Sequence, residues 1–321
     1  MTGDARILSP IEDAFFLTGP TAGGKTKIGV QLAKLIDAEV ISLDSMAVYR
    51  YMDIGTAKPT LSEREGVPHH QIDVRFPWEE YSLADYLKDA AQAAEAIRAR
   101  GKRVLFVGGT PLYLKGALCG IFEGPPADPG FRAELAEREK AEPGTLHRLL
   151  AEQAPDDAER LHPNDTRRIV RALEIIRVSG KSISSFQTQF KGAKDASGKK
   201  RGVILSWERP ILNGRINRRV DEMMLLGFLD EVKHLETLGK PLSKTALQGV
   251  GYAELTEVLR GRKSLPDAVE TVKLRTRHFA KRQETWFRSL PELISLPMND
   301  PFDARAVAEQ IADILLGGKG C

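Results

Sequence analysis

Residues Gly19 to Thr26, with the sequence GPTAGGKT, have a spacing that could hold a phosphate chain. They fit the pattern G-x-x-x-x-G-K-[ST], in which backbone N–H groups and the start of a helix converge on an anion. Lys25 adds a positive charge, and the Thr26 hydroxyl is a suitable ligand for Mg²⁺. The predicted phosphate loop consists of Gly19, Pro20, Thr21, Ala22, Gly23, Gly24, Lys25 and Thr26. The loop predicts a bound phosphate, but not the molecule that carries it.

The elements around this loop are those that the motif requires. An apolar run at 15–17 predicts a buried strand before the loop, and Ile28, Leu32 and Leu35 follow at helical spacing. A chance glycine-rich turn would need neither a strand before it nor a helix after it. The sequence therefore favours a strand, a phosphate-binding loop and a helix in this order.

Asp44 is the second candidate for chemistry. It ends a short apolar run at 39–44, and the ligands of open α/β sheets lie beyond the carboxyl ends of the strands. An aspartate at a strand end is often a cap or turn residue, a role that Ser45 could share. The neighbouring phosphate loop favours a general base, or an orienter for a nucleophile that attacks the bound phosphate ester.

A third apolar run, at 103–107, ends in Gly108, Gly109 and Thr110. Many P-loop NTPases carry at this place an aspartate that helps to hold Mg²⁺. Small residues and a hydroxyl suit the close approach of a substrate. The missing acid argues against an ATPase.

The composition excludes several classes of protein. The chain has 321 residues, enough for about two domains, and 28% of them are charged, as in ordinary globular proteins. Its two cysteines, Cys119 and Cys321, cannot form a disulfide framework, and residues 1–10 do not resemble a signal peptide. No apolar run is as long as a membrane span. We therefore expect a cytoplasmic protein without a membrane partner.

The charge is unevenly distributed, although the net charge is only +3. Residues 160–220 contain fifteen Lys or Arg against four Asp or Glu, and residues 273–288 contain six against one. Such a local excess is typical of nucleic-acid binding when it lies on one face, but a solvated helix surface gives the same counts. The spacing of the basic residues along the helices has to distinguish nucleic-acid binding from a solvated helix surface.

Two segments rich in Gly, Pro, Lys and Ser divide the chain. A Gly/Pro hinge lies at 120–128, and a Gly/Lys/Ser loop lies at 191–201, before an apolar run that predicts a returning strand. Only helical patterns lie between them. The sequence predicts an α/β fold, with a P-loop NTPase-like parallel sheet flanked by helices and an all-helical insertion. The core is expected at 1–122 and 191–321, and the insertion at 123–190.

Three helices carry arginines and lysines at helical spacing. In the helix that begins near Asp165, Arg167 and Arg171 lie one turn apart, opposite an apolar face, which favours RNA or phosphate binding. In the helix 212–226, Arg215 and Arg219 are also one turn apart, and an arginine fork suits a diphosphate. The last long helix, expected at 264–288, has basic stripes formed by Lys273, Arg275, Arg277, Lys281 and Arg282. We expect its Trp286 and Phe287 to lie in the core rather than to stack on bases.

Six segments together resemble the tRNA dimethylallyltransferase (tRNA isopentenyltransferase) family. The resemblance spans nearly the whole chain, in order, and the combination is far more specific than the phosphate loop alone. The segments are GPTAGGKT at 19–26, DSMAVYR at 44–50, MDIGTAKP at 52–59, GGTPLY at 108–113, LHPNDTRR at 161–168 and AKRQETWFR at 280–288.

The resemblance implies a substrate and a reaction. In this family the phosphate loop holds the diphosphate of dimethylallyl diphosphate. The dimethylallyl group passes to the exocyclic N6 amine of the adenosine immediately 3′ of the anticodon. Asp44 would accept the proton of the attacking amine. The leaving diphosphate would be steadied by Lys25, Thr26 with Mg²⁺, Thr110 and Arg215.

The resemblance also implies an RNA surface, with the inserted helices holding the anticodon stem-loop, and a monomer is expected. A target base has to leave the stacked loop to reach such a site. The implied tRNA contacts are Asp44, Ser45, Met46, Ala47, Arg167, Arg168, Ile169, Val170, Arg171, Gln248, Gly249, Val250, Gly251, Tyr252, Arg277, Lys281 and Arg282.

Four positions depart from the family pattern. Gly23 replaces a more usual Ser, Ala47 stands where Gln is common, Pro111 where Gly is common, and His278 where Gln is frequent. The change at Gly23 has little effect on a loop that binds through its backbone. Ala47 lacks an amide that could contact RNA.

Three other functions fit part of the sequence. A small-molecule P-loop kinase could use Asp44 to activate a hydroxyl, but the strand that ends in Gly108 and the basic insertion argue against it. A non-catalytic RNA-binding module explains the basic helices and leaves the phosphate loop unused. An enzyme that prenylates free adenine nucleotides would not need residues 123–190.

Overall fold

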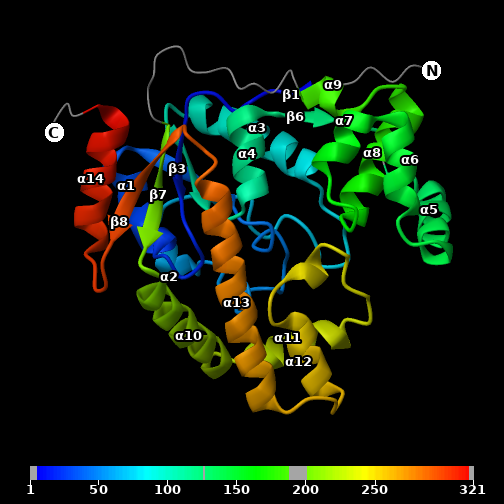
Figure 1. Ribbon diagram of the computed structural model, residues 1–321. Coiled ribbons are helices and arrows are strands. Elements are labelled where there is room, and N and C mark those ends of the chain that lie inside the picture. Colours follow the sequence, from blue (N-terminus) through cyan, green and yellow to red (C-terminus); the bar gives the residue numbers. More distant parts are fainter. Residues whose placement is uncertain (1–5, 126, 188–200, 318–321) are drawn as a thin grey trace. The chain divides into compact units, whose positions relative to one another are not determined.

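The computed structural model describes residues 6–125, 127–187 and 201–317 (Figure 1). The chain divides into two compact units. The larger takes in the described residues of Ile11–Ala117 and Lys199–Cys321, and the smaller those of Met1–Pro10 and Leu118–Gly198. The predicted Gly/Lys/Ser loop lies, except for Arg201, outside the described residues, as does Cys321.

The larger unit is built on a six-stranded sheet in which every strand pair is parallel. Its residues are mostly buried, as expected for strands covered on both faces. The order across the sheet is β4 (His69–His70), β3 (Ala38–Leu43), β5 (Arg103–Gly108), β2 (Ala14–Thr18), β7 (Gly202–Trp207) and β8 (Leu293–Met298). The predicted strands β2, β3, β5 and β7 are therefore present, and they are neighbours in the sheet.

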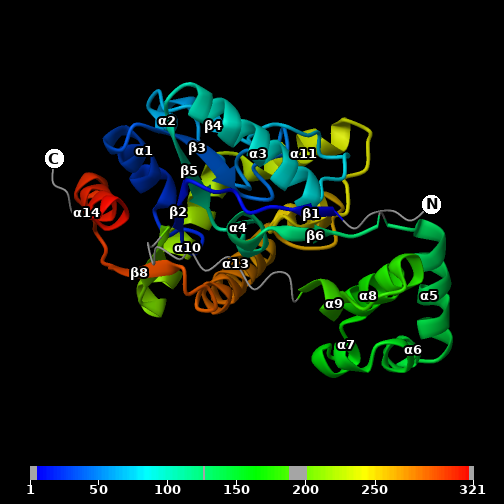
Figure 2. The ribbon, with the colours of Figure 1, turned by 90° about the horizontal axis from the view of Figure 1, so that it is seen from above.

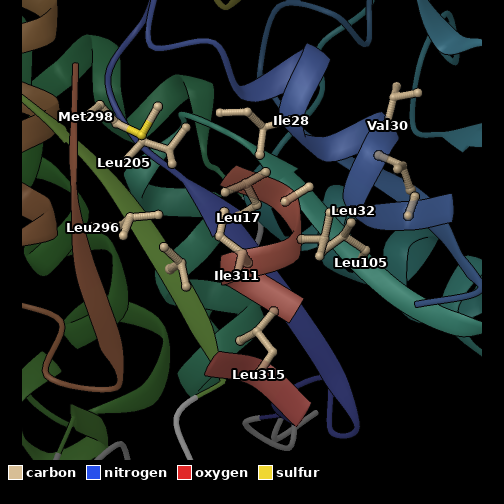
Figure 3. Packing of buried hydrophobic residues seen from close by; sticks show 14 of the residues in the cluster. Leu17, Ile28, Val30, Leu32, Leu105, Leu205, Leu296, Met298, Ile311 and Leu315 are labelled. Carbon is tan, nitrogen blue, oxygen red and sulfur yellow. The ribbon is translucent and has the colours of Figure 1, made fainter. Parts of the chain in front are cut away.

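Helices α1 (Lys25–Leu35) and α14 (Ala304–Leu316) pack together against the sheet. Leu17 of β2, Ile28 of α1 and Ile311 of α14 are fully buried in the same cluster, which Figure 3 shows from close by. Burial of such side chains is the main favourable term in folding. This cluster fixes α1, and with it the loop that precedes α1.

The remaining helices of this unit include two long ones, α10 (Arg209–Leu225) and α13 (Leu265–Phe287), which lie side by side (Figure 1, Figure 2). Helix α13 begins as the sequence predicts, because the Ser264 side chain accepts a hydrogen bond from the Asp267 N–H. The others are α2 (Leu61–Arg64), α3 (Leu83–Ala99), α4 (Pro111–Cys119), α11 (Phe228–Thr237), the 3₁₀ turn η2 (Ala246–Gln248) and α12 (Tyr252–Leu259).

The smaller unit contains five helices and a two-stranded antiparallel sheet among its described residues. Its apolar core includes Leu135, Leu150 and Leu173. The second segment of this unit begins at Leu118 rather than at 123, and the unit also includes the N-terminal strand, because that strand pairs with β6. Its elements are β1 (Arg6–Leu8), β6 (Ile121–Glu123), α5 (Pro129–Ala141), α6 (Thr145–Gln153), α7 (Pro155–Arg160), α8 (Thr166–Ser179) and α9 (Ile183–Gln187).

Strand β8 and helix α14 were not predicted from the sequence. Leu293, Leu296 and Met298 of β8 are buried, and Ala308, Ile311 and Leu315 form the buried stripe of α14. The spacing of these apolar residues was the signal from which the strand and the helix could have been predicted. Within the described part of the chain, no helix is long and apolar enough to cross a membrane.

Candidate active site

A cavity of about 1280 Å³ opens at the carboxyl ends of the central strands in the larger unit. Its lining comes from the phosphate loop, from the residues after β3 and β5, and from α10 and α13. Lys25, Asp44, Thr110 and Arg215 all line it. The fold therefore brings together four side chains that the sequence singled out from four separate segments.

The phosphate loop runs from β2 into α1, as its spacing predicts. Gly24, the residue before α1, has a φ of 86°, and a Cβ there would lie 2.5 Å from the Phe302 ring. Only glycine combines this backbone conformation with this close approach. Residues 21–27, which include the N-terminus of α1, line the cavity, and a helix N-terminus can bind an anion.

Lys25 lies within the curve of the loop. Its Nζ donates to Gly19 O at 3.0 Å and to Pro20 O at 2.8 Å. Burial of the ammonium group lowers the pKa of Lys25 to about 7; nearby Arg219 also lowers it, and Asp44 opposes the change. A buried lysine of this kind is ready to gain a proton when an anion arrives.

Asp44 combines a turn role with a catalytic position. Its Oδ1 accepts hydrogen bonds from Met46 N at 2.8 Å and from Ala47 N at 3.2 Å. No hydrogen bond to its Oδ2 is found among the residues that the structure describes. One oxygen therefore fixes the turn, and the second is left to accept a proton, so both sequence interpretations of Asp44 fit the geometry.

Thr110 is tied to the same turn. Its backbone N–H donates to Leu43 O at 3.0 Å, and its Oγ1 accepts from Ser45 N at 3.0 Å. Thr110 thus orders the backbone that follows Asp44. Its predicted contact with the diphosphate remains a prediction.

Gln283 of α13 was not singled out as a site residue, although it lies in the segment 280–288 that carries the family resemblance. Its buried amide lines the cavity and bonds both Thr21 of the phosphate loop and Gly109 of the turn after β5. Gln283 lies on the apolar stripe of α13, between the buried residues Ala280 and Phe287, and a polar residue in such a stripe was the available signal.

The two arginines of α10 differ in their surroundings. The Arg215 Nε donates to Ala22 O at 2.9 Å, and its guanidinium pairs with Asp300 and lies over the Trp207 ring. Arg219 has no hydrogen bond or ion pair among the described contacts, and burial lowers its pKa while Asp44 opposes that change. Arg215 thus supports the phosphate loop, whereas Arg219 lines the cavity with no hydrogen-bond partner among the described residues. The one-turn spacing in the sequence indicated both arginines as diphosphate ligands, but only Arg215 was predicted as a site residue.

The segment predicted to meet RNA after η2 is partly buried. Gln248, Gly249 and Val250 line the cavity, whereas the Tyr252 ring is only 1% exposed. The Tyr252 hydroxyl donates to Glu231 at 2.7 Å, and Gly251 is the residue before α12. The Tyr252 side chain therefore stabilises this segment from its buried side, and residues 248–250 are the part of the segment that a ligand in the cavity can contact.

The basic residues of α13 divide in a similar way. Arg282 lines the cavity, and Lys281 is exposed. The Arg277 Nη1 donates to Asn217 Oδ1 at 2.6 Å, which holds α13 against α10. Phe287 is buried, as expected, and Trp286 is half-buried under the Lys115 ammonium group. All three basic residues remain predicted RNA contacts.

Helix α8 of the smaller unit carries the other predicted RNA residues. Arg167 and Arg168 are exposed, whereas Ile169 is fully buried in the apolar core of that unit and Val170 packs against this core. Arg171 pairs with the buried Glu174 and donates to Pro125 O at 2.8 Å. The Ile169 side chain cannot reach a ligand here, and among the predicted RNA residues of this helix Arg167 and Arg168 are the exposed ones.

Comparison with known proteins identifies the family of this chain. The family model described as IPP transferase matches residues 47–290, and the model described as isopentenyl transferase matches residues 12–80. The tRNA dimethylallyltransferase of Thermotoga neapolitana is 46% identical over 270 residues, which cover 84% of this chain and 87% of that protein. The chain belongs to the tRNA dimethylallyltransferase family.

Solved structures of this family have the same fold. The crystal structure of the tRNA isopentenylpyrophosphate transferase of Bacillus halodurans is 38% identical, with a TM-score of 0.71 and 96% of each chain covered. A eukaryotic dimethylallyltransferase, solved in snapshots of its action on tRNA, is 30% identical with a TM-score of 0.78, over 95% of this chain and 79% of that one. The family and the P-loop α/β fold predicted from the sequence are confirmed. The dimethylallyltransferase is a prenyltransferase, and the comparisons do not favour the kinase alternative.

Proposed function

We propose that the enzyme transfers the dimethylallyl group of dimethylallyl diphosphate to the N6 amine of the adenosine 3′ of a tRNA anticodon. The observation that carries this proposal is that one and the same cavity is lined by Lys25, of the phosphate loop, and by Asp44, whose Oδ2 is left to accept a proton. Bond formation between N6 and the allylic carbon breaks the bond from that carbon to the diphosphate oxygen, which keeps the electron pair. The proton lost by N6 passes to Asp44.

The donor half of the cavity lowers the barrier through charge. An aryl amine is a weak nucleophile, so the rate depends mainly on stabilising the leaving diphosphate and on aligning the allylic carbon. The N-terminus of α1, Lys25 and Arg219 supply this stabilisation, and Arg215 holds the loop through Ala22. Replacement of Arg219 by Gln should raise the KM for dimethylallyl diphosphate about tenfold. An unchanged KM would remove Arg219 from the donor site.

Mg²⁺ fits the donor half through Thr26. No group of three or more His, Cys, Asp or Glu side chains that could hold a metal is present in the described ranges. Mg²⁺ often needs only one or two protein ligands, because phosphates and water complete its shell. Thr26 lines the cavity beside Lys25, so its hydroxyl could be the protein ligand. Bound Mg²⁺ would neutralise charge on the diphosphate.

The acceptor half of the cavity begins at Asp44. Residues 44–47 and 248–250 line it, and the cavity lining also includes Arg275 and Arg282 of α13. The adenosine has to leave its stacked loop to bring N6 to Asp44, as in other enzymes that modify bases. We assign Arg167 and Arg168 of α8 to the phosphates of the anticodon stem. The enzyme is proposed to act in the cytoplasm as a monomer.

The test is transfer of label from dimethylallyl diphosphate, with Mg²⁺, to an anticodon stem-loop that carries adenosine 3′ of the anticodon. Free AMP and a control with ATP as the only donor are run beside it. Label on the stem-loop alone supports the proposal. Label on AMP would instead assign the enzyme to free nucleotides. ATP consumption in the presence of small hydroxylated metabolites, without prenyl transfer, would make it a kinase.

A further inference from the structure

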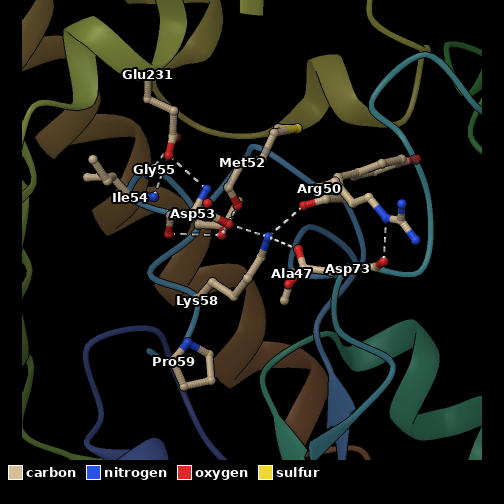
Figure 4. Close-up of polar contacts among 12 residues, drawn as sticks. Ala47, Arg50, Met52, Asp53, Ile54, Gly55, Lys58, Pro59, Asp73 and Glu231 are labelled. Carbon is tan, nitrogen blue, oxygen red and sulfur yellow. Dashed lines mark hydrogen bonds and ion pairs between the residues drawn. The ribbon is translucent and has the colours of Figure 1, made fainter. Parts of the chain in front are cut away.

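Glu231, near the start of α11, collects four hydrogen bonds from two segments that are far apart in the sequence. It accepts from Asp53 N at 2.8 Å, from Ile54 N at 2.6 Å and from Gly55 N at 3.1 Å. The Tyr252 hydroxyl adds the fourth at 2.7 Å. Figure 4 shows the carboxylate facing the Asp53–Gly55 backbone. Hydrogen bonds to a charged acceptor are the stronger kind, so this contact fixes the backbone firmly.

The two segments form one wall of the cavity. Residues 55–59 and 247–250 line it, and we call these two segments the acceptor wall. A Cβ on Gly55 would lie 2.1 Å from the Phe228 ring and 2.8 Å from the Tyr252 ring. The backbone at Gly55 therefore rests directly on these two aromatic rings, which are 5.1 Å apart and perpendicular. Glu231 joins Gly55, in the first segment of the wall, to Tyr252, which lies two residues beyond the second segment.

The acceptor wall connects to the turn that carries Asp44. Lys58, whose side chain is 4% exposed, donates to Tyr49 O at 2.6 Å and pairs with Asp53 and Asp73. The Asp73 N–H in turn donates to Ala47 O at 3.2 Å. Figure 4 shows Lys58 between the two aspartates, with Ala47 close by. Contacts thus run from Glu231 through the acceptor wall to Ala47, three residues after Asp44.

The donor side is held by different groups. The phosphate loop is braced by Gln283, by Arg215 and by the Trp207 indole, which bonds to Gly23 O at 3.3 Å. None of these three contacts Glu231 or the acceptor wall in the described interactions. A change at Glu231 is therefore expected to disturb the acceptor half and to leave the diphosphate site intact.

We infer that Glu231 is a positioning residue that shapes the acceptor wall for RNA. This inference rests on the proposed function, because it names the side of the same cavity that receives the adenosine. Glu231 cannot act as a direct RNA ligand, since its negative charge would repel phosphates and its oxygens are already occupied by protein donors. A simple electrostatic view predicts tighter RNA binding once this charge is removed. The positioning role predicts weaker binding.

The test compares Glu231→Gln and Glu231→Ala with Glu236→Gln, a matched change at an exposed site on the same helix. Steady-state prenyl transfer gives KM for the stem-loop, KM for dimethylallyl diphosphate and kcat. Fluorescence anisotropy gives the affinity for the stem-loop without turnover. We expect Glu231→Ala to raise the stem-loop KM and Kd about tenfold and Glu231→Gln to raise them less, because the amide keeps one acceptor oxygen. The KM for dimethylallyl diphosphate should stay within about twofold.

The alternatives give different results. Tighter RNA binding, or an equal rise in both KM values, would overturn the inference. A purely structural role would lower Tm in Glu231→Ala but leave the stem-loop KM of the folded enzyme unchanged, and this too would overturn it. Tyr252→Phe, which keeps the ring and removes only the hydroxyl, should show a smaller rise in stem-loop KM than Glu231→Ala. Failure of the wild-type enzyme to label the stem-loop would count against the proposed function itself, whereas a normal wild type with unchanged variants would count against Glu231 alone.

Discussion

The side-chain amide of Gln283 joins the phosphate loop to the turn that precedes Thr110. Its Oε1 accepts a hydrogen bond from Thr21 N at 2.9 Å, and its Nε2 donates to Gly109 O at 2.6 Å. The side chain is only 2% exposed. Since Thr110 in turn bonds Ser45, one amide helps to set the separation between the diphosphate site and the turn that carries Asp44.

Replacement of Gln283 by Met should therefore lower kcat more than it changes either KM. The methionine side chain adds no charge beside the diphosphate, but it loses both hydrogen bonds, and misplacement of reacting groups by about 1 Å can cost on the order of a hundredfold in rate. Steady-state kinetics with both substrates would measure the effect. Thr285→Ala, at an exposed position on the same helix, is the control. A rise in KM with unchanged kcat would contradict this role.

Asp44→Asn separates the two roles of the aspartate. The amide oxygen can still accept from Met46 N and Ala47 N, so the turn is kept, but the side chain can no longer take the N6 proton. General-base catalysis contributes roughly 10²–10⁴-fold, and we expect a loss of that size in kcat. Stem-loop binding, measured by anisotropy, should stay nearly unchanged. Retained turnover, or lost RNA binding, would remove Asp44 from the role of base.

Lys25 predicts a proton uptake when dimethylallyl diphosphate binds. Its pKa is lowered to about 7, first by burial and then by Arg219, so at pH 8 the ammonium is largely deprotonated in the free enzyme. The bound diphosphate favours the charged form and raises the pKa again. Affinity should therefore fall as pH rises above about 7, because proton uptake is coupled to binding.

Calorimetry at pH 8 in two buffers of different ionisation enthalpy measures this uptake. We expect about one proton per diphosphate bound for the wild type, following from one titrating lysine. Lys25→Met should bind more weakly and take up almost none. An uptake that persists in Lys25→Met would assign the titration to another group.

The salt dependence of RNA binding tests the basic helix α8. Arg167 is exposed, so Arg167→Ala should reduce the slope of log K against log salt by roughly 0.7–0.9, the contribution of one phosphate contact. Arg171 differs, because it pairs with the buried Glu174. Its replacement by Ala leaves that carboxylate less compensated and should lower the Tm of the enzyme.

The two variants therefore separate an RNA contact from a structural one. Replacement of both arginines should weaken RNA binding and flatten its salt dependence. An unchanged slope in the double variant would remove both residues from the RNA interface. Glu134→Gln, on the exposed face of α5, is a control for charge changes in the same unit.

The sequence by itself determined the phosphate loop, Asp44 and the central strands. These features are local: a loop whose backbone binds anions needs glycines and a lysine at fixed spacing, and a buried parallel strand needs a continuous apolar run. The order of six such segments was enough to indicate the family. Helix starts such as that of α13 were also predictable, because a cap is a contact between residues three positions apart.

Only the tertiary structure decided which side chains act on the site and which support it. Arg215 and Arg219 lie one turn apart on α10, but only the packing of α10 against the phosphate loop brings the Arg215 guanidinium to Ala22 O. Arg219 makes no such bond in the described contacts and lines the cavity. In the same way, Gln283 reaches Thr21 across 262 positions, and Glu231 reaches Gly55 across 176. Periodicity reports which face of an element is apolar, but a polar contact between distant segments depends on how the elements pack. That packing is set by the whole core, and no local pattern records it.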